Sequence, residues 1–60
     1  MSARELRRVE ARRRRYEAAR VELEAAMCDA RAAGVALRPI AEAAGLSVEW
    51  TRRITSKAAS

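Results

Sequence analysis

The first half of this 60-residue chain limits its fold more than any other feature, because residues 3–33 contain neither proline nor glycine. Most residues in this segment are alanine, arginine, glutamate or leucine, which favour helix, and Ser2 precedes it as a candidate N-cap. We therefore predict one continuous helix, which at 1.5 Å per residue would be about 46 Å long. A globule of this size does not need so long a helix, so we expect its two halves to have different roles.

The positive charge of the chain is concentrated in residues 1–15, which we call the arm. The chain has 13 Lys and Arg against 8 Asp and Glu, a net charge of +5. The arm alone accounts for this excess, and the remaining residues are neutral overall. Its consecutive arginines, Arg12–Arg15, point in almost every direction around a helix, so they cannot all be buried. This asymmetry indicates a polyanionic partner.

Residues 16–33 show the pattern of an amphipathic helix that packs against a core. At 100° per residue, one face holds Tyr16, Ala19, Leu23, Ala26, Met27 and Ala30. Leu6 and Val9 continue this apolar stripe into the arm, where Arg12 interrupts it. We therefore expect the stripe to pack within residues 16–60, which we call the body, and to weaken along the arm.

The two glycines divide the rest of the chain into two shorter predicted helices. Gly34 is placed to end the first helix, and a second helix is expected at residues 37–44, ended by Gly45. Ser47 is then a candidate N-cap for a third helix at about residues 47–58. The predicted inner faces consist of Leu37, Ile40, Ala41 and Ala44 in the second helix, and of Trp50, Ile54 and Ala58 in the third.

The residues around Gly45 follow a recognisable order: a branched residue, a small one, a turn glycine, a hydrophobic residue, an N-capping serine and a late hydrophobic residue. In chain order they are Ile40, Ala41, Gly45, Leu46, Ser47 and Ile54. This order resembles the helix-turn-helix of bacterial and phage transcriptional regulators and is similar to the sigma-factor region 4 variety. The resemblance covers residues 37–54 and implies an all-α, three-helix helix-turn-helix domain with a long basic N-terminal helix. Thr51 departs from the family, which usually has Val or Ile there, and Trp50 beside it is expected to supply core bulk.

The resemblance implies that the third helix enters the major groove of duplex DNA. The residues on its predicted outward side are Val48, Glu49, Arg52, Arg53, Thr55 and Ser56, of which all but Thr55 are our candidate base-reading residues. Arginine can form two hydrogen bonds to guanine, glutamate can accept one from cytosine, and valine can contact the thymine methyl group. Glu49 and Arg53 are also spaced to form an i, i+4 ion pair in solvent.

Other polar residues are better suited to phosphate contacts, which add affinity without sequence information. The candidates are Arg12, Arg13, Arg14, Arg15, Arg38, Ser47 and Lys57. Each phosphate neutralised by the arm would steepen the log–log salt dependence of binding by about 0.9. The function indicated is sequence-specific binding of double-stranded DNA by a small transcriptional regulator or recombination accessory factor.

The sequence leaves other partners open. The arginine-rich helix also suits a protein- or RNA-interaction module, in which Tyr16 could stack on a base. A homodimer could form through a heptad-like stripe whose apolar members are Leu6, Val9, Tyr16, Leu23 and Met27. Arg13 and Arg20 occupy two inward places of this stripe, which disfavours a long parallel zipper. RNA polymerase or a larger regulator is a further candidate partner.

The composition argues against an enzyme. The chain has no His, no Gly-rich phosphate loop and no G-x-S-x-G sequence, so we expect no catalytic residues and no cofactor. Its single cysteine, Cys28, cannot form an internal disulfide and has no His to share a zinc ion. No apolar run approaches the length of a membrane span. We therefore expect a cytoplasmic, nucleoid-associated protein with no metal and no membrane contact.

Overall fold

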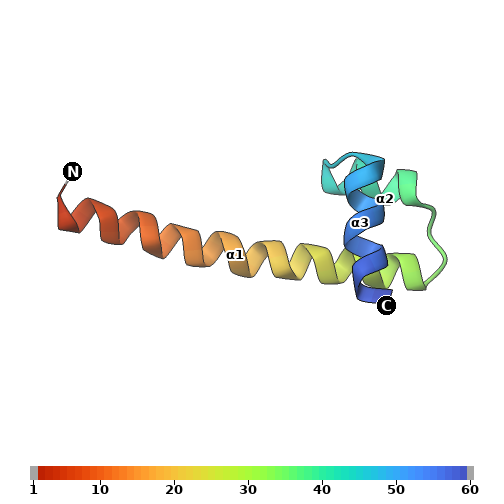
Figure 1. Ribbon diagram of the computed structural model, residues 1–60, viewed down its shortest axis with the longest axis horizontal. Helices are drawn as coiled ribbons and strands as arrows, with labels where there is room; N and C mark the ends of the chain where they lie inside the picture. The colour runs from red at the N-terminus through yellow and green to blue at the C-terminus, as the bar shows by residue number, and fades with distance from the viewer. Residues whose placement is uncertain (1, 60) are drawn as a thin grey trace.

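The fold of residues 2–59, which the computed structural model describes, is all-α and contains three helices. They are α1 (Ala3–Ala32), α2 (Leu37–Ala44) and α3 (Val48–Ala59). The molecule measures 48 × 20 × 15 Å, and α1 spans its long dimension (Figure 1). The N-terminal half of α1 stands apart from the other helices, which gather at its C-terminal end. Met1 and Ser60, the outer ends of the predicted arm and body, lie outside the described residues.

The helix predicted over residues 3–33 is present and ends one residue early, at Ala32. At its start, the Ser2 hydroxyl oxygen accepts a long hydrogen bond of 3.4 Å from the backbone N–H of Glu5. At its end, Gly34 adopts a φ of 93°, which a residue with a side chain rarely adopts. This turn lets the N–H of Val35 reach the carbonyl oxygen of Ala30 at 3.1 Å, so a carbonyl at the helix end is satisfied.

The second helix has the predicted bounds, and the turn after it depends on Gly45. This glycine has a φ of 71° and ends α2 in the left-handed conformation. The N–H of Leu46 then donates to the carbonyl oxygen of Ala41 at 3.0 Å. Ser47 caps α3 as predicted, because its hydroxyl oxygen accepts a hydrogen bond of 3.0 Å from the N–H of Trp50.

The core is small and draws on all three helices. Its buried members are Met27 from α1, Ile40 and Ala41 from α2, and Thr51 and Thr55 from α3. The two threonines are buried without unsatisfied hydroxyls, since each donates to a backbone carbonyl four residues earlier. Thr51 bonds Ser47 at 2.8 Å, and Thr55 bonds Thr51 at 2.9 Å. With its hydroxyl satisfied in this way, threonine fills the space of a valine.

The predicted inner face of α2 is confirmed, but that of α3 is partly wrong. Trp50 was expected in the core and is 49% exposed, whereas Thr55 was placed on the outward side and is buried. Ile54 is half-buried, and the Ala58 side chain lies outside the described residues. The inner face centres on Thr51, which can be buried because its hydroxyl is satisfied within the helix, and Trp50 lies about 100° around the helix from it and is half exposed.

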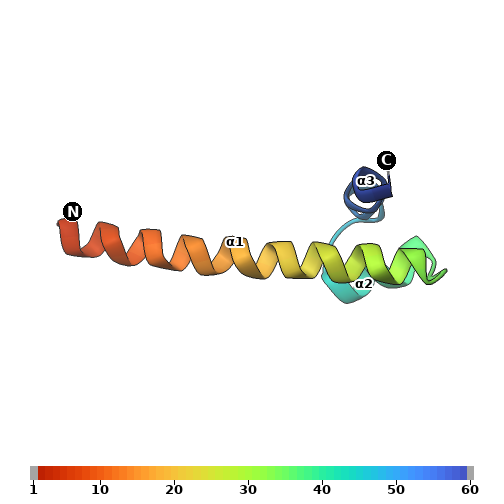
Figure 2. The same cartoon turned by 90° about the horizontal axis from the view of Figure 1, so that it is seen from below.

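The packing of α1 also extends less far than the apolar stripe predicted. Tyr16 was expected on the core face but is 64% exposed, and Leu23 is 41% exposed. Helix α3 crosses only the C-terminal part of α1 and is seen end-on after a 90° turn (Figures 1 and 2). Tyr16 therefore lies at the edge of the region that α3 covers, where it borders an open pocket with Leu46 and Trp50.

Candidate nucleic-acid interface

The exposed side of α3 carries four of the five candidate base-reading residues. Glu49, Arg52, Arg53 and Ser56 are exposed, while Val48 is half-buried. The opposite side of the helix is fixed to the body by the buried threonines Thr51 and Thr55. Because packing and exposure fall on opposite sides, α3 can present its arginines to a partner without unfolding.

Glu49 forms its ion pair with Arg52, at 2.8 Å, and not with Arg53 as the i, i+4 spacing allowed. Both side chains are more than half exposed. An exposed pair of this kind contributes about 0–1 kcal/mol to stability. The Arg52 guanidinium can therefore leave Glu49 and bind a partner at a small cost in free energy. Until then, Glu49 holds the guanidinium close to the surface of α3.

Arg53 and Lys57 border an open groove between α3 and α1. The side of the groove formed by α1 includes Arg20 and Glu24, and Trp50 also lines it. Neither Arg20 nor Trp50 belongs to the site expected from the sequence. The spacing of Thr51 and Thr55, four residues apart on one helix face, was the signal that could have placed Trp50 outside.

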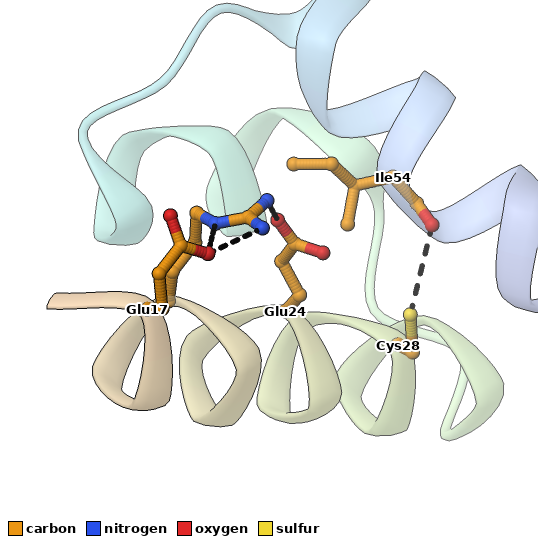
Figure 3. A network of polar contacts seen from close by, with 5 residues as sticks. Glu17, Glu24, Cys28 and Ile54 are labelled. Atoms are coloured by element: carbon orange, nitrogen blue, oxygen red, sulfur yellow. Dashed lines mark hydrogen bonds and ion pairs between the residues drawn. The ribbon is translucent and has the colours of Figure 1, made fainter. Parts of the chain in front are cut away.

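The charge of Arg20 is compensated within α1. Its guanidinium contacts Glu17 at 2.9 Å and Glu24 at 3.0 Å (Figure 3). The hydrogen bond to Glu17 and the charges of both carboxylates raise the pKa of Arg20. This cluster of one arginine and two glutamates has a net negative charge, so the positive charge bordering the groove comes from Arg53 and Lys57 on α3.

Cys28 connects α1 to α3 in the same region. It is half-buried, and its thiol donates a weak hydrogen bond of 3.8 Å to the carbonyl oxygen of Ile54 (Figure 3). Ile54 faces α1 through this contact, which helps to fix the rotation of α3 about its own axis.

Within residues 2–59, no three His, Cys, Asp or Glu side chains gather in a way that could hold a metal ion.

The phosphate candidates lie in two separate places. Arg12–Arg15 are exposed on the projecting half of α1, far from α3 (Figure 1). Arg38, Ser47 and Lys57 are exposed on α2, the turn and α3. The Ser47 hydroxyl already accepts the N–H of Trp50, which leaves its O–H for an outside acceptor.

No protein-family model matches this sequence, and comparisons with characterised proteins and with solved structures find no match. Over the described residues, no helix is both long enough and apolar enough to cross a bilayer.

Proposed function

We propose that this protein binds duplex DNA sequence-specifically and that α3 is the helix entering the major groove. The observation that carries the proposal is the placement of Glu49, Arg53 and Ser56 on the exposed side of a helix that is fixed by buried threonines. The α2–turn–α3 unit, with its left-handed Gly45 and three-residue turn, supports a helix-turn-helix interpretation.

Within this proposal the candidate residues differ in role. Arg53 and Arg52 are suited to bond guanine, and Glu49 can accept from a cytosine amino group. Val48 is half-buried, so it contributes to the packing of α3, and only the exposed part of its side chain can contact a thymine methyl group. Thr55 has no part in base reading because it is buried.

The arm supplies affinity rather than sequence preference in this proposal. The thirteen α1 residues that precede Tyr16 extend about 20 Å at 1.5 Å per residue. The arginines on this segment can contact phosphates on the strand beside the groove that α3 occupies. A protein with these two parts suits a small transcriptional regulator or recombination accessory factor at the bacterial nucleoid.

Selection from a pool of random duplexes tests the proposal, followed by fluorescence anisotropy with the selected duplex and a scrambled one. We expect a consensus sequence. Arg53→Ala should reduce the preference for it by about 1–3 kcal/mol if one bidentate base contact is lost. Arg14→Gln removes the same charge from the arm and should weaken both duplexes equally. A pool that yields no consensus, or a preference unchanged by Arg53→Ala, would contradict the proposal.

A second candidate function is RNA binding by the arm. One observation favours it: Tyr16 is 64% exposed directly after the four consecutive arginines, so its ring is available to stack on an unpaired base. Competition between the selected duplex and a pool of RNA hairpins distinguishes the two functions. Tighter binding to hairpins, lost in Tyr16→Ala, would assign the arm to RNA.

A further inference from the structure

The chain exposes more surface than a protein of its mass normally does. A folded monomer of 6.7 kDa exposes about 3,900 Å² on average, whereas this chain exposes 5059 Å². The excess is about 1,150 Å², and each partner in a standard protein interface buries about 800 Å². The surplus surface is therefore large enough for a stable interface.

One unpartnered surface is a groove between α1 and α2 that is lined entirely by apolar side chains. Leu23, Ala26 and Met27 form the side of the groove that belongs to α1, and Pro39, Ile40 and Ala43 form the α2 side. The small alanines keep the groove open to another helix. This groove involves no α3 residue, so an occupant would leave the candidate nucleic-acid interface uncovered.

The second unpartnered surface is the apolar stripe of the arm, formed by Leu6, Val9 and Tyr16. These side chains are 47%, 58% and 64% exposed and lie on one side of α1. Leu6 and Val9 belong to the N-terminal half of α1, which stands apart from α2 and α3 (Figure 1), and Tyr16 borders an open pocket beside Trp50. The stripe is about 15 Å long, and the groove side of α1 from Leu23 to Ala30 is about 10 Å. Arg12 and Arg13 lie within the stripe, but their aliphatic stems can cover apolar surface while the guanidinium groups reach outward.

The arm cannot fill the groove of its own chain. Helix α1 is unbroken from Ala3 to Ala32, so the arm points away from α2 and cannot fold back. A second copy has no such restriction, because its arm can enter the groove from outside. The stripe of one molecule can therefore occupy only the groove of another molecule.

Charge selects the direction in which two copies would pair. The arm has an excess of five positive charges, whereas residues 16–32 carry Glu17, Glu22, Glu24 and Asp29 against only two arginines. Antiparallel α1 helices place each arm beside the acidic half of the other. Parallel helices would place the two arms side by side, where their like charges repel.

We propose that two copies of this chain form a dimer by exchanging arms, with the Leu6–Val9–Tyr16 stripe of each in the α1–α2 groove of the other. The two α1 helices run antiparallel and cross near Ala19, whose small exposed side chain permits a close approach. The interface is isologous, so each dimer contains two equal arm–groove contacts. The arginines Arg4, Arg7 and Arg15 lie on the far side of the arm from the stripe and stay exposed.

Sedimentation equilibrium from low micromolar to about 0.5 mM protein tests this dimer. Wild-type protein should approach twice 6.7 kDa. Val9→Glu in the stripe and Ala43→Glu in the groove should each raise the dissociation constant more than about tenfold. Ala11→Glu is the matched control, since Ala11 lies about 200° around the helix from Val9 and should leave the dimer intact. Circular dichroism checks that each variant keeps its helices.

Mixing the two defective variants separates arm exchange from other dimers. An equal mixture of Val9→Glu and Ala43→Glu chains should regain dimer in part, because the mixed pair keeps one intact arm and one intact groove. Wild-type protein that stays monomeric at every concentration would overturn the proposal. A dimer that Ala43→Glu leaves unchanged would overturn it too, because the stripes would then pair with each other.

Discussion

The two ends of α1 have a similar helical sequence but opposite surroundings. Toward its C-terminus, Met27 is buried in the core, whereas Leu6 and Val9 near the N-terminus are exposed. The same apolar stripe therefore becomes core where neighbouring helices cover it and free surface along the arginine-rich arm, which they do not cover. Changes of buried residues in the body should thus alter folding, whereas changes of exposed residues in the arm or on the outer side of α3 should alter binding.

Ile40→Ala should have the largest effect and tests the body side of this comparison. Replacing a buried isoleucine by alanine costs about 2–5 kcal/mol, which is comparable to the whole stability of so small a core. Urea unfolding followed by circular dichroism and by fluorescence of Trp50, the single tryptophan, measures the loss. Arg14→Ala is the control and should change the stability by less than about 0.5 kcal/mol. Equal losses in both variants would contradict the division between arm and body.

Replacing Arg12–Arg15 together by Gln tests the arm side. Affinity for duplexes of unrelated sequence should fall on the order of 100-fold at low salt, and the log–log salt slope should flatten by up to about 3.6, since four phosphate contacts are lost. Anisotropy titrations at several salt concentrations measure both quantities. The urea midpoint should stay unchanged. A salt slope equal to that of the wild type would mean that the arm does not contact phosphates.

Thr51 provides a smaller and sharper test of the core. In Thr51→Val the hydroxyl is lost, but the Ser47 carbonyl still accepts the Thr51 backbone N–H at 2.9 Å, so stability should change by less than about 1 kcal/mol. Thr51→Ser keeps the hydroxyl and loses a buried methyl group, which should cost about 0.5–1.5 kcal/mol. The two variants together show whether shape or hydrogen bonding holds α3. A larger loss in the valine variant would favour hydrogen bonding.

Glu49→Gln should have the smallest effect on folding, below about 0.5 kcal/mol, because its pair with Arg52 is exposed. Affinity for duplexes of unrelated sequence should rise slightly, since a negative charge close to the DNA phosphates is removed, and the preference for the selected duplex should fall, since the acceptor for a cytosine amino group is lost. Thermal unfolding and anisotropy measure the two quantities. An unchanged preference for the selected duplex would show that Glu49 does not accept from a base.

The three helices and their ends could be predicted from the sequence because local residues determine them. The absence of Pro and Gly from residues 3–33 and the left-handed turns at Gly34 and Gly45 act within a few residues of chain. The Ser47 cap is equally local. Patterns of this kind need no knowledge of how the helices pack.

The rotation of α3 could not be predicted, because it depends on contacts between helices. Hydrophobicity favoured Trp50 over Thr51 as a core residue, yet Thr51 is fully buried and Trp50 is 49% exposed. A threonine that satisfies its hydroxyl within the helix fits instead. The exposure of Tyr16 could not be predicted for the same reason, because it depends on how far α2 and α3 extend along α1.

The unbroken course of α1 couples the direction of the arm to the number of residues between it and the body. One alanine inserted after Ala18 would turn the whole arm by about 100° and move it about 1.5 Å outward. Seven inserted residues would return the arm to within about 20° of its first direction, at a distance about 10 Å greater. The direction of the arm relative to the body therefore changes with each residue inserted into or deleted from α1. Only changes of about seven residues would keep this direction.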